Sequence, residues 1–407
     1  MDIAVDLHSH SGYAGGVGKI TLKDVSETMK LKGIDIFGTG DSLFPPRADF
    51  LKENLIGENG IYHLKKDSAK FVLQTEIILT TKLENYKQRI VAHHVILFPD
   101  FQSIYKMQKL LEKWGMKNTI GRPFITNENK EQLVERLFEI QAIDPYLEII
   151  PAHVMTPEGI MGSKNNLKSI QEFYGEFTSE INAIETGLSA DPKMLERIPD
   201  FANLTMISNS DCHSSALNRI GREFTTLEMK EMNYFEMINS IRENKVKFTA
   251  EFNPKEGKFF NTGHRKSRTG HSEPYFYEGD FVEKLICPTC QKKVNIGVNL
   301  RTKYLSDASI IPQKRKYLYL IPLIEVIAYS LKIKNVKSRQ VLKSYHKIMN
   351  IFPNEITIWK STDSEIVEQL DKEIEAKIVS NILSVKNGDF AFNPPGYDGE
   401  YGVLEIR

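Results

Sequence analysis

Seven short apolar runs, each ending in a polar tip, recur through the first 250 residues and limit what the chain can fold into. The runs are IAVDLHSH, IDIFGTGD, FVLQTEI, RIVAHHVILF, LEIIPAHV, INAIETG and LTMISNSDCH. Stretches of helical period lie between several of them, including LKDVSETMKLKG, which closes on Gly33, and KEQLVERLFEIQAI. Strands alternating with helices predict parallel β/α units with functional groups at the carboxyl ends of the strands. We therefore expect an α/β fold with a distorted seven-stranded barrel, and an open doubly wound sheet is the competing interpretation.

The character of the sequence changes after about residue 250, which predicts further structural units. Residues 251–305 contain NTGHRKSRTGHSEP and the knuckle CPTC, a composition typical of a small zinc-ribbon-like module. Residues 306–407 return to apolar residues at three- and four-residue spacing, as in YLIPLIEVIAYSLKI, and predict a C-terminal helical domain. The expected division is therefore a barrel over 1–250, a module over 251–305 and helices over 306–407.

Several protein classes are disfavoured by the sequence. No run approaches the roughly 18 apolar residues that a membrane span requires. The N-terminal segment MDIAVDLHSH lacks the charged and apolar regions of a signal peptide. The chain has three cysteines, and Cys287 and Cys290 lie too close in sequence for a disulfide between them to stabilise the fold. We expect a cytoplasmic protein without a membrane partner.

The net charge of zero hides a basic middle segment. Residues 251–350 hold 19 Lys and Arg against 8 Asp and Glu, a net charge of +11. Such a cluster is a candidate footprint for a polyanion, although a solvated lysine-rich surface is the plainer alternative. Interleaved Tyr317, Tyr319 and Tyr345 stand at spacings that favour core positions over base stacking. The residues expected to contact the phosphates of such a polyanion are Lys314, Arg315, Lys316, Lys332, Lys334, Lys337 and Arg339.

Histidines and acids gather at the ends of the apolar runs. His8 and His10 are separated by one residue, which on a strand puts both imidazoles on one face, and Asp211 and His213 repeat this spacing. Six of the seven histidines before residue 250 fall at such positions, and only His63 does not. Polar groups at buried strand ends are costly unless a metal or a hydrogen-bond network compensates them. Glu76, Asp41, His93, His94 and His153 complete the set.

This donor set predicts a metal cluster. Mixed imidazole and carboxylate ligands suit zinc, manganese or iron better than magnesium or calcium. Because the donors exceed the needs of one ion, we expect two or three divalent ions, with Zn²⁺ or Mn²⁺ ahead of Mg²⁺. Phosphoester hydrolysis is the reaction that makes most use of such a cluster.

In order along the chain, D-x-H-x-H-S, G-T-G-D, the strand glutamate, P-A-H and S-D-x-H resemble the motifs of the polymerase and histidinol phosphatase (PHP) superfamily of metallophosphoesterases. The resemblance implies a distorted (β/α)7 barrel and favours His94 over His93, because His94-Val95-Ile96-Leu97 reproduces the family pattern. Tyr13 stands about where relatives carry a further ligand. The implied catalytic residues are Asp41, Glu76, Asp211 and His213, and the implied metal ligands are His8, His10, Asp41, Glu76, His94, His153, Asp211 and His213.

A more specific resemblance spans almost the whole chain and points to the endonuclease Q branch of that superfamily. It is carried by LKGIDIFGTGD, AIETGLSADP, SNSDCHS, IGREFTTLE, TGHR before CPTC, VNIGV and PGYDGEYG. It implies cleavage of DNA 5′ to uracil, hypoxanthine, xanthine or an abasic site, leaving 3′-hydroxyl and 5′-phosphate ends. DNA would be the partner, together with repair or replication factors. Glu185, Tyr397 and Asp398 are expected to line the substrate pocket, although a plain β-turn also explains the last two.

The small module departs from the family pattern. The family places G-H-R-x-C upstream of C-P-x-C, and this chain has Ser267 where that cysteine would lie. His264, Cys287 and Cys290 are then the expected zinc ligands, with His271 or water as the fourth, and a metal-free loop is the alternative.

Two rival functions share these features. A small-molecule phosphatase of the histidinol phosphatase type would use the same ligands but leaves residues 250–407 unexplained. A non-catalytic DNA-binding scaffold with a structural metal would require a cluster closed to water.

Overall fold

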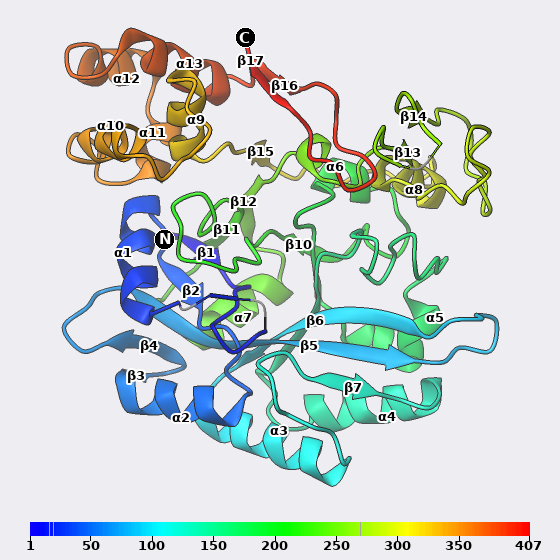
Figure 1. Cartoon of the computed structure of the whole chain (residues 1–407). Helices are drawn as coiled ribbons and strands as arrows, with labels where there is room; N and C mark the ends of the chain where they lie inside the picture. Colours follow the sequence, from blue (N-terminus) through cyan, green and yellow to red (C-terminus); the bar gives the residue numbers. More distant parts are fainter. Residues whose placement is uncertain (16, 19, 269) are drawn as a thin grey trace.

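The computed structural model describes residues 1–15, 17–18, 20–268 and 270–407. Eleven strands form one large mixed sheet, with the order β15-β12-β11-β1-β2-β5-β4-β3; β6 pairs with β5 and β8, and β7 with β5 (Figure 1). The strands are β1 (Asp2–Asp6), β2 (Ile36–Gly38), β3 (Leu55–Glu58), β4 (Ile61–Leu64), β5 (Lys70–Thr81), β6 (Ile90–Phe98), β7 (Phe124–Thr126), β8 (Glu148–Pro151), β11 (Phe224–Glu228), β12 (Val246–Glu251) and β15 (Tyr317–Tyr319).

Strands β9 (Ala183–Glu185) and β10 (Thr205–Ile207) form a separate parallel pair, in which β9 contacts β8 and β10 contacts β12. The Val154 amide donates to the Glu185 carbonyl (3.1 Å), and the Ser208 amide donates to the Thr225 hydroxyl (2.8 Å). Within the described residues no backbone ladder connects this pair to the large sheet. A mixed α/β fold is therefore confirmed, whereas closure into a barrel is not established by the ladders.

All seven predicted apolar runs contain strands, but they are not all parallel. β5 and β6 pair antiparallel over nine residue pairs, and β6 and β8 are antiparallel as well. The expectation of parallel β/α units was wrong here because residues 82–89 contain no helix that could carry the chain back across the sheet.

The helices of the first part include the two that the hydrophobic period predicts. The Thr21 hydroxyl caps α1 by accepting from the Asp24 amide, and Gly33 ends it in a left-handed conformation with φ of 85°. The elements are α1 (Leu22–Lys32), α2 (Pro45–Asn54), α3 (Phe101–Lys113), α4 (Lys130–Gln141), α5 (Gln171–Tyr174), the 3₁₀ turn η1 (Gly175–Glu180), α6 (Pro192–Leu195), α7 (Tyr234–Arg242) and the 3₁₀ turn η2 (Pro254–Glu256).

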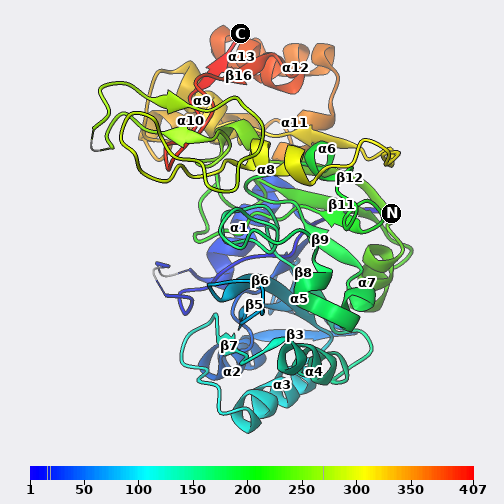
Figure 2. The same ribbon diagram turned by 90° about the vertical axis from the view of Figure 1, so that its right-hand side faces the viewer.

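Residues after about 250 lie on one side of the sheet-bearing part, as both ribbon views show (Figure 1, Figure 2). The small module has its own core of Leu285, Cys287, Val294 and Ile296. A separate core of apolar side chains, including buried Tyr345, holds the C-terminal helices together. The elements are β13 (Gly263–His264), β14 (Tyr275–Phe276), α8 (Val298–Leu305), α9 (Leu323–Ser330), α10 (Arg339–Met349), α11 (Glu355–Lys360), α12 (Asp363–Leu370), α13 (Ala376–Lys386), β16 (Phe390–Phe392) and β17 (Leu404–Ile406).

The parts are joined by strands and loops as well as by packing. Strand β15 carries Tyr317 and Tyr319, both half-buried, and pairs with β12 of the large sheet. The C-terminal loop returns to the sheet-bearing part, since the Gly396 amide donates to the Lys255 carbonyl (2.7 Å). No helix in the described ranges has the length and apolar character to cross a lipid bilayer.

Candidate metal centre

Strand ends far apart in sequence converge on one cluster. His8 and His10 follow β1, His153 follows β8, Asp211 follows β10, and Glu76 lies within β5. The backbone is left-handed at His153 (φ of 32°) and Asp211 (φ of 45°), an uncommon conformation for such residues. The clustering of strained residues is typical of functional sites.

One group of donors surrounds the side-chain nitrogens of His8 and His10. The Nε2 atom of His10 lies 3.1 Å from Asp211 Oδ1 and 3.4 Å from Glu76 Oε2. The Nε2 atom of His8 lies 3.5 Å from Asp211 Oδ1 and 3.9 Å from Glu76 Oε1. Four side chains from three strands therefore point their donor atoms at one small volume.

A second group shares Glu76 with the first. Glu76 Oε1 lies 2.6 Å from His93 Nδ1 and 3.4 Å from His153 Nε2. One carboxylate thus faces both groups, which is the arrangement of a bridging ligand. Arg122, which the motifs did not single out, places Nη1 3.3 Å from Glu76 Oε2.

His213 lies at the open side of the first group. Its side chain is 46% exposed, and its ring centroid is 4.5 Å from that of His10. Its ligand atom can approach those of His10 and Asp211 closely enough to share an ion.

The cluster fits a cation. His8 Nε2, His10 Nε2 and Asp211 Oδ1 are buried and have no hydrogen-bond partner among the described atoms. Buried polar atoms left in this way are costly, and a metal ion would satisfy all three. The donor set of imidazole and carboxylate matches Zn²⁺ or Mn²⁺.

The charges of the cluster also favour a cation. Burial raises the pKa of a carboxyl group, yet His10, His153 and His93 outweigh it and hold the pKa of Glu76 well below its usual value. Burial opposes protonation of His8, but the charges of Glu185, Asp211 and Glu76 raise its pKa to about 9. These shifts favour an ionised Glu76 beside a protonated His8, whose proton an incoming metal ion would displace.

His93, not His94, lies with the cluster, whereas the family motif in the sequence favoured His94 as the ligand. His94 is fully buried on the other face of β6, where its Nε2 lies 2.6 Å from the Tyr174 hydroxyl. Neighbouring residues of a strand point to opposite faces, so only one of the two can reach Glu76. Burial lowers the pKa of His94 to about 3, which keeps the ring neutral.

Two further buried carboxylates hold the rings of His8 and His10. Glu185 places both oxygens 3.0 Å from His8 Nδ1, and Asp41 Oδ1 lies 3.3 Å from His10 Nδ1. Neither belongs to a group of donors that could share an ion among the described residues. Asp41 thus lies behind the His10 ring, whereas the sequence predicted that Asp41 itself is a metal ligand. Glu185 lies beneath the cluster, whereas the sequence predicted that it lines the substrate pocket.

The small module brings four donors together. His264, His271, Cys287 and Cys290 can place one ligand atom each within 4.8 Å of one another. His271 Nε2 and His264 Nδ1 each lie 3.4 Å from a cysteine sulfur. Burial raises the pKa of a thiol, yet the amides of Cys290 and Thr289 lower the pKa of Cys287. His271 lies at the fourth position, which the sequence left between His271 and water.

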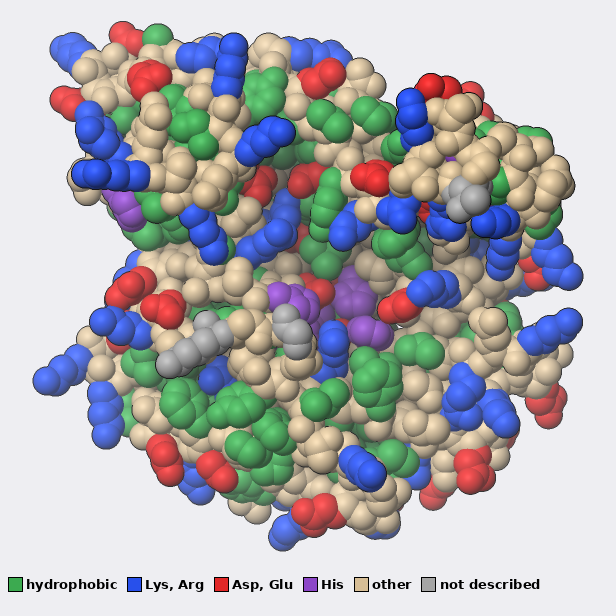
Figure 3. All heavy atoms as spheres, viewed as in Figure 1, with side chains coloured by type: hydrophobic (Ala, Val, Ile, Leu, Met, Phe, Trp, Pro, Cys, Tyr) green, Lys and Arg blue, Asp and Glu red, His purple; other side chains and the backbone are tan. Residues whose placement is uncertain are grey.

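A cleft of about 940 Å³ opens over the metal cluster and is bounded by all parts of the chain. Figure 3 shows the histidines gathered in this hollow with Lys and Arg side chains around it. Arg219 is exposed there, and the ammonium group of Lys258 lies 4.6 Å from the ring centroid of Tyr401. The lining residues include His93, His153, Asp211, His213, Arg219, Arg222, Phe252, Lys258, Phe259, Asn295 and Tyr401.

The predicted DNA-contacting residues lie elsewhere. Lys314 and Lys316 are exposed near the Val246 end of β12, opposite to the Glu251 end that adjoins the cluster. Arg315 is half-buried and donates through Nη2 to the carbonyls of Ala202 and Leu204 (3.0 Å each). Lys332, Lys334, Lys337 and Arg339 are exposed between α9 and the start of α10.

The turn at Tyr397 and Asp398 connects the C-terminal loop to the module. Asp398 is buried and accepts from the Arg265 amide (2.9 Å), the Arg268 guanidinium and Asn295 (3.1 Å). Tyr397 packs against Phe276 with ring centroids 4.6 Å apart. Neither residue is among those that line the cleft over the cluster.

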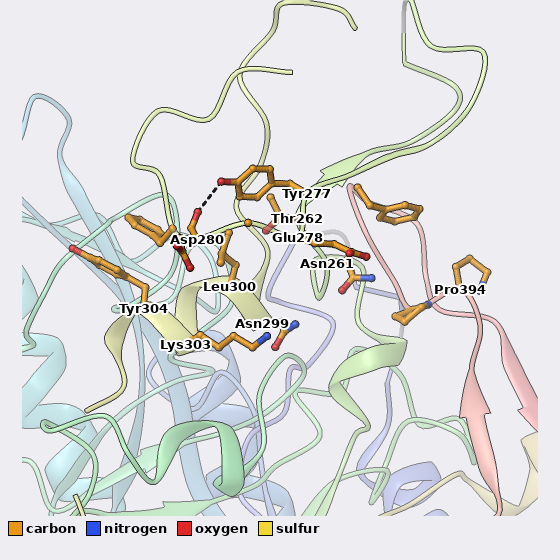
Figure 4. A pocket seen from close by; sticks show the side chains of 14 residues that line it. Asn261, Thr262, Tyr277, Glu278, Asp280, Asn299, Leu300, Lys303, Tyr304 and Pro394 are labelled. Carbon is orange, nitrogen blue, oxygen red and sulfur yellow. Dashed lines mark hydrogen bonds between the residues drawn. The ribbon is translucent and has the colours of Figure 1, made fainter. Parts of the chain in front are cut away.

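A second cavity, of about 820 Å³, lies on the module between the β14 loop and α8 (Figure 4). Phe281 and Tyr304 stack at one end with ring centroids 3.9 Å apart, and the Tyr277 hydroxyl donates to the Asp280 carbonyl. None of the metal-cluster residues lines this cavity.

Comparison with known proteins confirms the resemblance to endonuclease Q along the whole chain. No protein-family model matches the chain. An uncharacterised protein of Methanocaldococcus jannaschii is 29% identical over 251 residues, which are 59% of this chain and 30% of that protein, so the match covers less than a third of that relative. The lesion-specific endonuclease PfuEndoQ from Pyrococcus furiosus is 27% identical, with a TM-score of 0.82 covering 100% of this chain and 96% of the other. Endonuclease Q bound to a 27-mer duplex with an abasic lesion at its active site is 27% identical, with a TM-score of 0.82 covering 100% and 97%.

Proposed function

We propose that this chain, which shares the whole fold of endonuclease Q, is a metal-dependent endonuclease that acts on damaged DNA. It would hydrolyse the phosphodiester 5′ to uracil, hypoxanthine, xanthine or an abasic site, leaving 3′-hydroxyl and 5′-phosphate ends. The observation that carries the proposal is the full-length match to a lesion-specific endonuclease, because it includes the module and the helices as well as the metal centre. A small-molecule phosphatase would have no use for the 157 residues after position 250.

The residues of the cluster would hold Zn²⁺, Mn²⁺ or Mg²⁺. His8, His10, Glu76 and Asp211 would form one ligand set, and Glu76, His93 and His153 another. When bound, such ions polarise phosphoryl oxygens and lower the pKa of the attacking water. Glu185 and Asp41 orient the ring nitrogens of His8 and His10, and His213 closes the exposed side.

The fold and the module complete the proposal. We take the strands around the cluster as a PHP-type (β/α)7 barrel over 1–250 in which the β9–β10 pair closes the ring through the contacts of Glu185 with Val154 and of Ser208 with Thr225. The module over 251–305 would carry one structural zinc ion, because four protein ligands are what such sites use. Replacing Cys290 by Ser should then remove one zinc ion per chain.

The cleft over the cluster would receive the lesion. A base inside a duplex cannot be read along its pairing edge, so the damaged nucleotide would leave the stack and enter the cleft. Phe252, Phe259 and Tyr401 offer apolar surface for a base or sugar, while Arg219 and Lys258 offer positive charge for the phosphates.

An incision assay distinguishes the endonuclease from the phosphatase and from the non-catalytic scaffold. A labelled duplex with a single uracil, hypoxanthine or abasic site should be nicked, while the undamaged duplex and histidinol phosphate should not react. Phosphate release from the small ester without nicking would support the phosphatase. Lesion binding without turnover at saturating metal would support the scaffold.

Arg219→Ala should weaken duplex binding and lower the slope of log K against log salt by about 1, because each phosphate contact releases about one counterion. Binding of a labelled abasic duplex is measured by anisotropy at about 50 to 200 mM salt, with chelator present to prevent cleavage. The matched control is Lys314→Ala/Lys316→Ala, which removes two charges at the far end of β12 and should leave the slope unchanged. The opposite pattern would place the DNA on the far surface.

A further inference from the structure

We propose that the basic triplet Lys314-Arg315-Lys316 and the buried hydroxyl of Thr249 form a binding site for a phosphate group, separate from the metal centre. The occupant would be a tetrahedral oxyanion such as free inorganic phosphate. The triplet directly precedes β15, and the Lys316 carbonyl accepts from the Thr249 amide (3.1 Å), so the triplet is attached to β12.

A small cavity lies against the triplet near the Val246 end of β12. Its volume is about 90 Å³, and all three residues of the triplet line it together with Thr249. Because a water molecule takes about 30 Å³ of the liquid, the cavity has room for about three waters or for one small anion. None of the metal-cluster residues lines this cavity, so its ligand would not be the one that enters the cleft.

The Arg315 guanidinium is held in place and still has donors to spare. Its Nη2 atom donates to the carbonyls of Ala202 and Leu204 (3.0 Å each), which fixes the plane of the group. Its Nε and Nη1 atoms are buried and have no hydrogen-bond partner among the described atoms. Of the arginines in the described part of the chain, Arg315 alone leaves two buried nitrogens unpaired. Phosphate oxygens are the acceptors that a guanidinium binds most strongly.

The positive charge of the triplet is not neutralised by the surrounding sequence. The chain contains no acidic residue between Asp307 and Glu325. The charge of Glu196 raises the pKa of Arg315, but burial lowers this pKa by more. Lys314 and Lys316 are exposed on either side in the sequence and add to the positive charge. An anion in the cavity would compensate a half-buried charge that is otherwise costly.

The Thr249 hydroxyl is an independent indication of the same site. Thr249 is 2% exposed, and its Oγ1 atom has no partner among the described atoms. A buried hydroxyl without a partner is costly, and a phosphate oxygen would accept from it. Gln313, which also lines the cavity, turns its side-chain oxygen to Asn244 Nδ2 (3.2 Å), so its amide nitrogen remains as a further donor.

A bound anion would stabilise the segment that joins the module to the C-terminal helices. Residues 306–316 connect α8 to β15, and Arg197 holds this segment through the carbonyls of Ala308 (3.1 Å) and Ile310 (2.9 Å). An anion between Arg315 and Thr249 would add a contact at the other end of the segment. A ligand that binds only the folded chain raises its melting temperature as the ligand concentration rises.

Phosphate binding by the intact, metal-loaded chain tests the proposal. Dialysis against radiolabelled inorganic phosphate counts the phosphates per chain, and the melting temperature is followed at constant ionic strength with chloride as the balancing anion. Arg315→Met should bind one phosphate fewer than the unmodified protein, because any phosphate at the metal centre is common to both. Thr249→Val keeps the shape of the side chain and should weaken the same site about 10-fold or more, the usual effect of losing a hydrogen bond to a charged group.

Arg197→Met is the matched control, because Arg197 also donates to two carbonyls but does not line the cavity. It should bind as many phosphates as the unmodified protein. Equal phosphate binding by Arg315→Met, Thr249→Val and the unmodified protein would overturn the proposal and leave the cavity to water. If Arg315→Met does not fold, Thr249→Val decides the question by the same measurement.

A second arm with undamaged duplex DNA identifies the source of the phosphate group. We expect Arg315→Met to bind the duplex as tightly as the unmodified protein does, which makes the source a free anion. A loss of duplex affinity in Arg315→Met, together with competition between phosphate and duplex in the unmodified protein, would keep the site and assign it to the DNA backbone.

Discussion

Replacing Asp211 by Asn should lower the rate of lesion-dependent nicking about 10³-fold or more and leave duplex affinity nearly unchanged. Asp211 Oδ1 lies between His8 and His10, within 3.5 Å of both Nε2 atoms, and asparagine keeps its size but removes the negative charge. Metal ions in such sites supply several kcal/mol of transition-state stabilisation, and about 4 kcal/mol corresponds to about 10³ in rate. Single-turnover cleavage of an abasic duplex measures the change. Affinity should persist because the charges that would hold DNA belong to other lining residues of the cleft, Arg219 and Lys258.

Asp307→Asn provides the matched control for this substitution. Asp307 is an exposed carboxylate on the loop after α8, where it accepts from Ser309, and it takes no part in the cluster. Its loss should leave the rate within about twofold, as expected for a surface change. Equal rates for Asp211→Asn and the unmodified protein would remove Asp211 from the reaction. His8→Ala should behave as Asp211→Asn does.

Replacing Lys32 by Met should lower the free energy of unfolding by about 3 to 5 kcal/mol, the usual cost of leaving one partner of a buried ion pair alone. Lys32 in α1 and Glu355 in α11 are 2% and 1% exposed, and their charged atoms lie 2.8 Å apart. Glu355 also accepts from the Leu323 amide (2.8 Å) and lies 3.3 Å from the Tyr345 hydroxyl, so a negative charge would remain buried at the contact between the first and last parts of the chain. Urea unfolding followed by tryptophan fluorescence and circular dichroism measures the loss.

Lys30→Met, two residues earlier in the same helix, is the control for the loss of a lysine. Lys30 is 50% exposed and pairs with Asp67 at 2.9 Å, and exposed pairs contribute about 0 to 1 kcal/mol. Lys32→Met/Glu355→Gln should recover part of the stability, because the unpaired charge is removed. An unfolding curve for Lys32→Met that matches the unmodified protein would mean that the contact between α1 and α11 does not hold the parts together.

The positions of the strands were predictable from sequence because each apolar run is long enough to be buried and ends at a polar tip. The same feature could not resolve His93 from His94. Both lie inside β6, and both faces of this strand are largely buried. Burial therefore does not indicate whether His93 or His94 lies on the face toward Glu76. The family motif selected His94, and only the pairing of β6 with β5 and β8 decides the side.

The sequence also could not indicate which charges face the cleft. The net charge of +11 belongs to residues 251–350 as a whole. The lysines and arginines that carry this charge are spread over the module, β15 and the helices. Arg219 lies outside the basic segment, and Lys258 is only one of its many cations. Both reach the cleft because the loops after β10 and β12 meet over the cluster. In the same way, the sequence placed Asp41 at a strand end, but its side chain turns behind His10.

Incision of a defined lesion by metal-free and metal-restored protein tests the central claim most directly. The protein is stripped with chelator, mixed with a duplex that carries one abasic site, and then given Mn²⁺ or Zn²⁺, and the product ends are mapped. We predict no cut before the ions are added, and afterwards a single cut 5′ to the lesion that leaves a 3′-hydroxyl and a 5′-phosphate. Incision that proceeds equally well in the stripped protein, or restored protein that leaves the abasic strand intact, would contradict the account.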